Sequence, residues 1–143
     1  MTPVECPVAC VDADGGLMLN VQELATLKRL AAPGFVLFVM NNDGYESIRT
    51  SQQRHFGAVF GSDDESGVSI PPFDQLSAAF GLPYRKVETL AELDAFLAAY
   101  DPKAPPIMVD VMVSRSEPRG PTVRTITHPD GRLSSTPLAE IDW

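Results

Sequence analysis

Two short groups of polar and small residues follow two apolar runs, and both groups offer oxygen atoms that could bind a metal ion. Asp14–Gly16 follows the apolar residues 8–12, and Asn42–Gly44 follows the apolar residues 35–40. A carboxylate, an amide oxygen and free backbone carbonyls are hard ligands that suit Mg²⁺ or Ca²⁺. The glycines allow the backbone to approach an anion closely. Together the two groups predict a metal-bridged diphosphate site.

Each group taken alone also fits an ordinary turn, because Asp, Asn and Gly are common turn residues after strands. The two groups are separated by one strand–helix–strand unit. In an α/β sheet, ligands bind at the carboxyl ends of parallel strands, where both groups are expected to lie. The pairing of the two groups therefore favours a binding site over two unrelated turns.

The elements that must position these residues are apolar strands alternating with amphipathic helices. We expect strands at residues 8–12, 35–40, 84–87 and 107–113, and helices at residues 20–30, 43–54, 73–80 and 90–100. Continuous apolar strands are typical of parallel sheets that helices cover on both faces. The pattern predicts an α/β fold, a three-layer sandwich with a mainly parallel sheet.

Several local features refine this prediction. Asn20 and Glu23 have the spacing of a capping box, which would open a helix whose N–H groups point towards the site. Thr89 is the expected cap of the last helix. Residues 56–72 form a long connection, typical of a functional or interface loop, and its acidic centre "SDDESG" is interpreted as solvated. We divide the chain into a domain at 1–113 and an irregular C-terminal arm at 114–143.

Composition limits the classes of function. The chain has 143 residues and a formal net charge of −8, which argues against nucleic acid or an anionic membrane as the main partner. It shows no apolar run of transmembrane length and no visible signal peptide, so we expect a cytoplasmic protein. Cys6 and Cys10 are interpreted as reduced, partly buried thiols rather than zinc ligands. His55 and His128 are expected at the surface or at an interface.

The sequence "DADGG…N…QELAT…NNDGYESIR" resembles the signature of thiamine-diphosphate-dependent enzymes of the acetolactate synthase and pyruvate decarboxylase superfamily. That signature contains Gly-Asp-Gly, a helix with Glu-Leu, and Asn-Asn after the next strand; Ala13 replaces its first glycine here. The segments "SGVSIPPFDQLSAAFGLP" and "APPIMVDVMV" and the tail also resemble acetolactate-synthase-like members. The resemblance implies the C-terminal diphosphate-binding domain, with thiamine diphosphate and Mg²⁺ as cofactors.

The resemblance also implies roles for residues at matching positions. The metal would be held by the side chains of Asp14 and Asn42 and by the backbone carbonyl of Gly44. The diphosphate would be lined by Gly15, Gly16, Tyr45, Glu46 and Ser47. Glu23 is interpreted as a structural or cap residue. Arg49 would face an anion or form an ordinary salt bridge.

Enzymes of this family are much longer, and their catalytic glutamate lies in a separate pyrimidine-binding domain. No glutamate of this chain matches that context, so no catalytic residue is assigned. We expect a carboligase or decarboxylase acting on 2-oxo acids, inactive as this chain alone. It would need a longer polypeptide or subunit that carries the pyrimidine domain, in an oligomer. The substrate itself is not predicted.

Two other functions are compatible with the sequence. The chain could be a non-catalytic binding or scaffold subunit that keeps the fold, although a scaffold would not need the oxygen ligands at Asp14 and Asn42. An unrelated nucleotide-binding domain is disfavoured, because the chain lacks a Walker lysine and a Gly-x-Gly-x-x-Gly turn.

Overall fold

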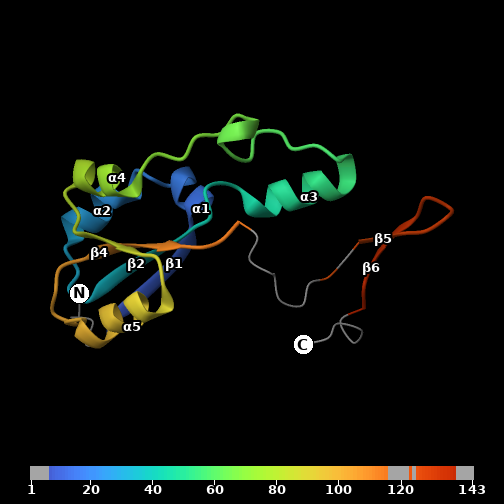
Figure 1. The fold of residues 1–143 in the computed structure, drawn as a ribbon. Coiled ribbons are helices and arrows are strands. Elements are labelled where there is room, and N and C mark those ends of the chain that lie inside the picture. Colours follow the sequence, from blue (N-terminus) through green and yellow to red (C-terminus); the bar gives the residue numbers. More distant parts are fainter. Residues whose placement is uncertain (1–6, 116–122, 124, 138–143) are drawn as a thin grey trace.

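A parallel sheet of four strands forms the centre of the molecule (Figure 1). The computed structural model describes residues 7–115, 123 and 125–137. The strand order is β1-β2-β4-β3, and all three neighbouring pairs are parallel. The strands are β1 (Val8–Ala13), β2 (Phe35–Asn41), β3 (Tyr84–Val87) and β4 (Ile107–Met112). The predicted α/β fold with a mainly parallel sheet is confirmed.

Helices cover both faces of this sheet. They are α1 (Asp14–Leu19), α2 (Glu23–Leu30), α3 (Glu46–Phe56), α4 (Phe73–Phe80) and α5 (Leu90–Ala99), with a short 3₁₀ turn, η1, at Asp64–Ser66. Figure 1 shows α1, α2 and α4 on one face and α5 on the other. Helix α3 extends away from the carboxyl ends of the strands, where it buries no residue.

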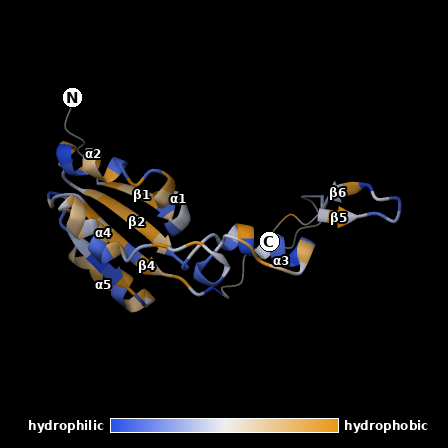
Figure 2. Cartoon of the chain, turned by 90° about the horizontal axis from the view of Figure 1, so that it is seen from above, coloured by the Kyte–Doolittle hydropathy of each residue, from blue (hydrophilic) through white to orange (hydrophobic). Residues whose placement is uncertain are grey.

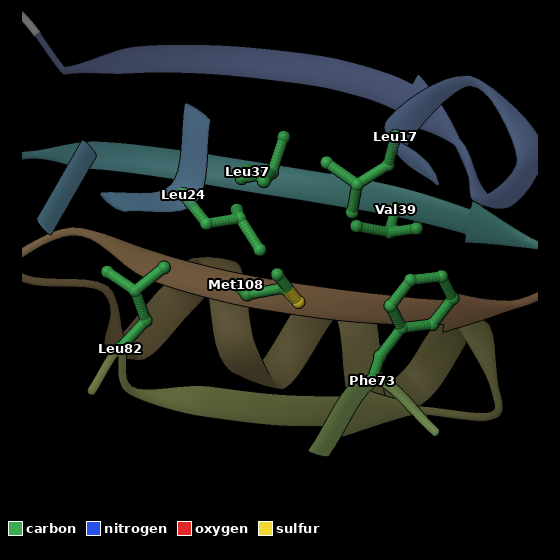
Figure 3. Close-up of a cluster of buried hydrophobic side chains, with 7 residues drawn as sticks. All are labelled: Leu17, Leu24, Leu37, Val39, Phe73, Leu82 and Met108. Carbon is green, nitrogen blue, oxygen red and sulfur yellow. The ribbon is translucent and has the colours of Figure 1, made fainter. Parts of the chain in front are cut away.

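The core consists of two clusters, one on each face of the sheet. Alternate residues of a strand point to opposite faces, so Leu37 and Val39 of β2 join one cluster and Val36 joins the other. Figure 3 shows the larger cluster, which is formed by Leu17, Leu24, Leu37, Val39, Phe73, Leu82 and Met108. Full burial of one such side chain stabilises the fold by about 1.5–3 kcal/mol. These contacts fix the helices against the sheet that positions the site.

Strand β1 differs from the prediction of a buried strand. Val11 is 65% exposed, and Cys10, expected to be partly buried, is exposed as well. The prediction was wrong because β1 lies at an edge of the described sheet, with β2 as its one paired neighbour there. Figure 2 shows that β1 is nevertheless largely hydrophobic. Cys6 lies outside the described residues.

The first helix begins earlier than predicted. Helix α1 starts at Asp14, directly after β1, and Asn20 ends it. Helix α2 follows at Glu23 with no side-chain cap, so the predicted capping box was wrong. The expected cap, Asn20, lies instead at the C-terminal end of α1, where its N–H donates to the carbonyl of Leu17 at 3.0 Å.

The other predicted helices have simpler outcomes. Helix α4 has the predicted bounds. Thr89 caps α5 as predicted, because its side chain accepts a hydrogen bond from the N–H of Glu92 at 3.2 Å. Helix α3 begins three residues after the predicted start, because Asp43 and Gly44 have φ angles of 62° and 133° that no helix accommodates.

The C-terminal arm is not wholly irregular. Within it, β5 (Thr125–Thr127) and β6 (Leu133–Ser135) form an antiparallel pair. Gly131, at φ 79°, closes the turn between them, so the expectation of an irregular segment was wrong here. Figure 1 shows this hairpin away from the four-stranded sheet. Across the described residues, every helix is too short or too polar to cross a membrane.

Candidate functional site

The two groups of residues singled out in the sequence meet at one edge of the sheet. Asp14 follows β1, Asn42 follows β2, and these strands are parallel neighbours with Ala13 beside Met40. The N–H of Asn42 donates to Oδ2 of Asp14 at 3.1 Å. The structure therefore brings the carboxylate and the amide together at the carboxyl ends of the strands, where α/β sheets bind ligands.

The carboxylate of Asp14 is the centre of this arrangement. The residue is 0% exposed. Its Oδ2 accepts a second bond, from the N–H of Gly44 at 2.8 Å, and its Oδ1 accepts the bond from Gly15. Within the described structure, all three donors are backbone groups. They offset the cost of burying a charge, and they fix the loop of residues 42–44 against the start of α1.

The loop itself requires glycine at position 44. Gly44 has φ 133°, and a Cβ atom there would lie 2.3 Å from the carbonyl oxygen of Ser62. The same carbonyl accepts a bond from the N–H of Tyr45 at 2.7 Å. Residues 42–45 are thus held between Asp14 on one side and Ser62 on the other.

One acceptor in this loop lacks a partner. Within the described structure, Oδ1 of Asn42 is buried and makes no hydrogen bond. A buried acceptor without a partner is unfavourable by about 1–3 kcal/mol, so it indicates a missing donor or cation. The carbonyl of Gly44 accepts a bond from the N–H of Glu46 at 3.2 Å and keeps a second lone pair.

The described residues contain no cluster of three or more His, Cys, Asp or Glu side chains that could hold a metal ion. A cation at this edge would therefore use mixed oxygen donors: one carboxylate, one amide and one backbone carbonyl. Mg²⁺ is commonly bound in this way, with water and phosphate oxygens completing its octahedron.

Gly15 and Gly16 serve close packing in the structure. A Cβ atom on Gly15 would lie 2.5 Å from the ring of Tyr45, and one on Gly16 would lie 2.3 Å from Oδ1 of Asp12. Both glycines lie in the first turn of α1. Their expected contact with a diphosphate stays a prediction, as does that of Tyr45.

Glu46 and Ser47 open helix α3, directly after the loop. The carboxylate of Glu46 accepts bonds from Nε of Arg49 at 2.8 Å and from the hydroxyl of Thr50 at 2.7 Å. Ser47 is exposed. Arg49 also forms an ion pair with Asp63 at 3.0 Å, so the salt-bridge interpretation of Arg49 describes its contacts in the structure. Burial opposes its charge, but both carboxylates outweigh burial and raise the pKa of Arg49.

Sequence reasoning missed the role of Ser62 and Asp63, which were interpreted as part of a solvated loop. Ser62 is 0% and Asp63 5% exposed. Asp63 forms a capping box with Ser66, and its side chain accepts from the N–H of Ser66 at 3.0 Å. The Ser66 hydroxyl and then the Arg49 guanidinium lower the pKa of Asp63. The Asp-x-x-Ser spacing was the signal that could have revealed this cap.

A second buried aspartate, Asp110 of β4, was also missed. It is 3% exposed. Its Oδ1 accepts from Nδ2 of Asn41 at 3.0 Å, and its Oδ2 accepts from the hydroxyl of Tyr84 at 2.8 Å. Burial, and then the bond to Asp110, raises the pKa of Tyr84. The available signal was a single charge inside the apolar strand "IMVDVM".

The two histidines lie outside this arrangement of bonds. His55 is exposed on α3, and Nε2 of His128 shares a 2.7 Å hydrogen bond with the hydroxyl of Ser134 in the hairpin. The exposure of His55 agrees with the predicted surface or interface location, whereas His128 is half-buried in its hairpin.

Comparison with known proteins adds a family to this geometry. The family described as "Thiamine pyrophosphate enzyme, C-terminal TPP binding domain" matches residues 2–111. The chain is 31% identical over 110 residues to the acetolactate synthase large subunit of Parasynechococcus marenigrum, a match that covers 77% of this chain and 18% of that protein.

Other relatives give the same picture. The chain is 31% identical over 107 residues to the acetolactate synthase isozyme 2 large subunit of Escherichia coli (72% of this chain, 19% of that protein). It is 28% identical over 138 residues to the chloroplastic acetolactate synthase of Arabidopsis thaliana (88% of this chain, 20% of that protein). The chain thus spans only 18–20% of the length of these curated relatives.

Proposed function

Because the chain belongs to the family of C-terminal TPP-binding domains of thiamine pyrophosphate enzymes, and is acetolactate-synthase-like, we propose how it holds its cofactor. The diphosphate of thiamine diphosphate (thiamine pyrophosphate, TPP) binds through Mg²⁺ at the carboxyl ends of β1 and β2. The observation that carries this proposal is the buried, unpartnered Oδ1 of Asn42 beside the buried carboxylate of Asp14.

The proposed metal ligands are Asp14, Asn42 and Gly44. Their donor set of one carboxylate, one amide and one carbonyl fits a hard cation, and it leaves positions for phosphate oxygens. The backbone bonds to Asp14 orient its carboxylate, as outer-shell partners commonly do at metal sites. A divalent cation would also give the orphaned oxygen of Asn42 a partner.

The proposed diphosphate contacts are Gly15, Gly16, Tyr45, Glu46 and Ser47. The first turn of α3 follows closely after the loop of residues 42–44, and the start of a helix offers backbone N–H groups that favour anions. The carboxylate of Glu46 would repel a diphosphate, but its ion pair with Arg49 offsets that charge. With this charge offset, the backbone of Glu46 can contact the diphosphate.

The division of labour follows from these contacts. When bound, the cofactor supplies the stabilisation of a carbanion next to its thiazolium ring. Residues of this chain bind and orient the diphosphate and provide no catalytic group. We propose that the complete protein is a carboligase or decarboxylase acting on 2-oxo acids. Its catalytic glutamate and pyrimidine domain come from another segment or subunit, so this chain alone is inactive.

Exposed apolar side chains support the proposed partner. Phe56 is 74% exposed at the end of α3, and Phe60, in the following loop, is 64% exposed. Exposed hydrophobic patches often mark protein interfaces. We propose that residues 1–113 form the cofactor-binding unit, that residues 114–143 form an arm, and that the assembly is a cytoplasmic oligomer.

A scaffold subunit without catalysis remains the second candidate, because the exposed apolar residues would serve it equally well. The two candidates differ at Asn42, since a scaffold has no use for a cation there. We expect Mn²⁺, as a probe for Mg²⁺, to bind the chain in the presence of TPP, as measured by loss of the free Mn²⁺ signal in electron paramagnetic resonance.

The variant Asn42→Leu should weaken this binding at least about tenfold, because it removes one metal ligand. Asn20→Leu is the matched control, since Asn20 is exposed at the end of α1. Equal binding by both variants would contradict the proposed ligand set. The assembled enzyme should also consume a 2-oxo acid only when TPP is added; turnover that ignores TPP would reject the proposed activity.

A further inference from the structure

Asp110 places a carboxylate inside an apolar strand, and neither the proposed metal site nor the diphosphate site uses it. The residue is 3% exposed, and the two residues before it, Met108 and Val109, are 0% exposed. A buried charge is unfavourable unless hydrogen bonds compensate it. Here the two oxygens of Asp110 accept one bond each, from Asn41 of β2 and Tyr84 of β3. The carboxylate therefore ties the strands on both sides of β4.

The bond to Asn41 fixes the orientation of that amide. A carboxylate only accepts, so the NH₂ group of Asn41 must face Asp110. The other end of the amide, Oδ1, then accepts a bond from the N–H of Asp43 at 3.1 Å. The bonds form a continuous series from Tyr84 through Asp110 and Asn41 to the backbone of Asp43.

Asp43 is the residue at which this series acts on the site. Its φ of 62° is uncommon for a residue other than glycine and needs support from its surroundings. It lies between Asn42 and Gly44, which both donate backbone bonds to Asp14. Asn41 therefore holds the middle of the loop, while Asp14 holds its two flanking amides.

We propose that Asp110 is a positioning residue: through Asn41, it sets the conformation of residues 42–44 and so the placement of the proposed metal ligands. This proposal rests on the proposed function, which assigns metal binding to the loop of residues 42–44. Asp110 contacts neither metal nor cofactor in this account. The carboxylate of Asp43 is held separately, by Arg115, which leaves the backbone N–H of Asp43 as the point where Asp110 acts.

Amide hydrogen exchange of the full chain tests this proposal without any cofactor. Asp110→Leu should speed the exchange of the Asp43 amide at least about tenfold, since the amide of Asn41 is then free to turn. The amides of Val39 and Val109 should change by less than about threefold, because they report on the sheet rather than on the loop.

Two further variants separate positioning from simple loss of structure. Tyr84→Phe removes the other bond to the same carboxylate and keeps the bond to Asn41, so the Asp43 amide should change by less than about threefold. Asn41→Asp alone sets two carboxylates against each other and should also speed the exchange of that amide. Combining Asn41→Asp with Asp110→Asn restores one donor and one acceptor. Protection should then return to within about threefold of the wild type.

The proposal is overturned if Asp110→Leu leaves the Asp43 amide unchanged or speeds all amides equally, or if the combined exchange fails to rescue the single change. If Asp110→Leu does not fold, the proposal is tested by the exchange rate of the Asp43 amide in Asn41→Asp and in the variant that combines it with Asp110→Asn. Binding of Mn²⁺ with TPP is measured on the same samples. If the wild type does not bind Mn²⁺ with TPP, the proposed function is rejected. The amide hydrogen exchange of the variants then still tests the role of Asp110. Binding that Asp110→Leu leaves intact rejects the positioning role alone.

Discussion

Two buried aspartates lie on the same sheet, and the structure satisfies them by different means. Within the described residues, the carboxylate of Asp14, after β1, accepts bonds only from backbone N–H groups, whereas that of Asp110, in β4, accepts bonds only from side chains. The surroundings of Asp14 therefore depend on backbone conformation, which glycine at position 44 makes possible. The surroundings of Asp110 depend on the identity of two distant side chains. Two buried aspartates of one sheet should therefore respond to quite different substitutions.

The largest expected effect is at Asp14. Asp14→Ala leaves three backbone N–H groups without their acceptor, at about 1–3 kcal/mol each. The free energy of unfolding should fall by at least about 3 kcal/mol in urea titration. Asp110→Ala frees two donors and should be less destabilising. An equal or larger loss of stability in Asp110→Ala would contradict this account of the two aspartates.

Alanine substitutions at two glycines test whether the site around Asp14 depends on backbone conformation. Gly44 and Gly57 both have positive φ, but a Cβ on Gly44 would meet Ser62, while a Cβ on Gly57 would meet nothing within 4 Å. Gly57→Ala should lower the free energy of unfolding by about 1 kcal/mol. Gly44→Ala should lower it at least about twice as much, because the φ of 133° lies outside the left-handed region open to other residues and a steric clash adds to that strain. Thermal unfolding of both variants measures this, and equal losses would contradict it.

A third buried aspartate, Asp63, combines both kinds of support, since it accepts from the backbone and hydroxyl of Ser66 and from Arg49. Its pKa is lowered in the folded state. Its contribution to stability is therefore present above the unfolded pKa of about 3.9, and is lost as the pH falls through the lower folded value. Asp63→Asn should be less stable than the wild type at pH 7.

The stability difference between the wild type and Asp63→Asn should shrink as the pH is lowered below about 4. The carboxyl of Asp63 is then protonated first in the unfolded state and, at lower pH, in the folded state as well. Urea titrations at a series of pH values measure it. A difference that stays constant across this range would mean that the charge of Asp63 does not matter.

The smallest expected effect is at Tyr84. Tyr84→Phe removes one hydrogen bond to Asp110, at about 0.5–1.5 kcal/mol in unfolding free energy. Because burial raises the pKa of Tyr84, the contribution is complete below about pH 10 and is lost as the pH rises through the folded value. The two proteins should therefore converge in stability at strongly alkaline pH. Divergence there would contradict the role given to this hydroxyl.

The meeting of Asp14 and Asn42 could be predicted because it follows from simple rules. Each residue ends an apolar strand, and parallel strands joined by a helix place their carboxyl ends at one edge. Helix α4 and the cap at Thr89 were predictable for a similar reason, since their signals are local. Local patterns thus gave the architecture and the candidate site.

Other features depend on contacts that a local pattern does not contain. Asn20 had the spacing of a cap, yet α1 already begins at Asp14 and Asn20 lies at its end. The partners of Asp110 lie on two other strands, and their identity follows only from the sheet register. The exposure of β1 likewise depends on its place at an edge of the described sheet rather than on its own residues.

The most direct test is titration calorimetry with TPP and with thiamine, each with and without Mg²⁺. The titrations use the chain alone and the chain mixed with a polypeptide that carries the pyrimidine domain. We predict binding only for TPP with Mg²⁺, and its loss in Asn42→Leu but not in Asn20→Leu. Thiamine binding as tightly as TPP, binding that does not need Mg²⁺, or no binding in either sample would contradict a metal-bridged diphosphate site at Asp14 and Asn42.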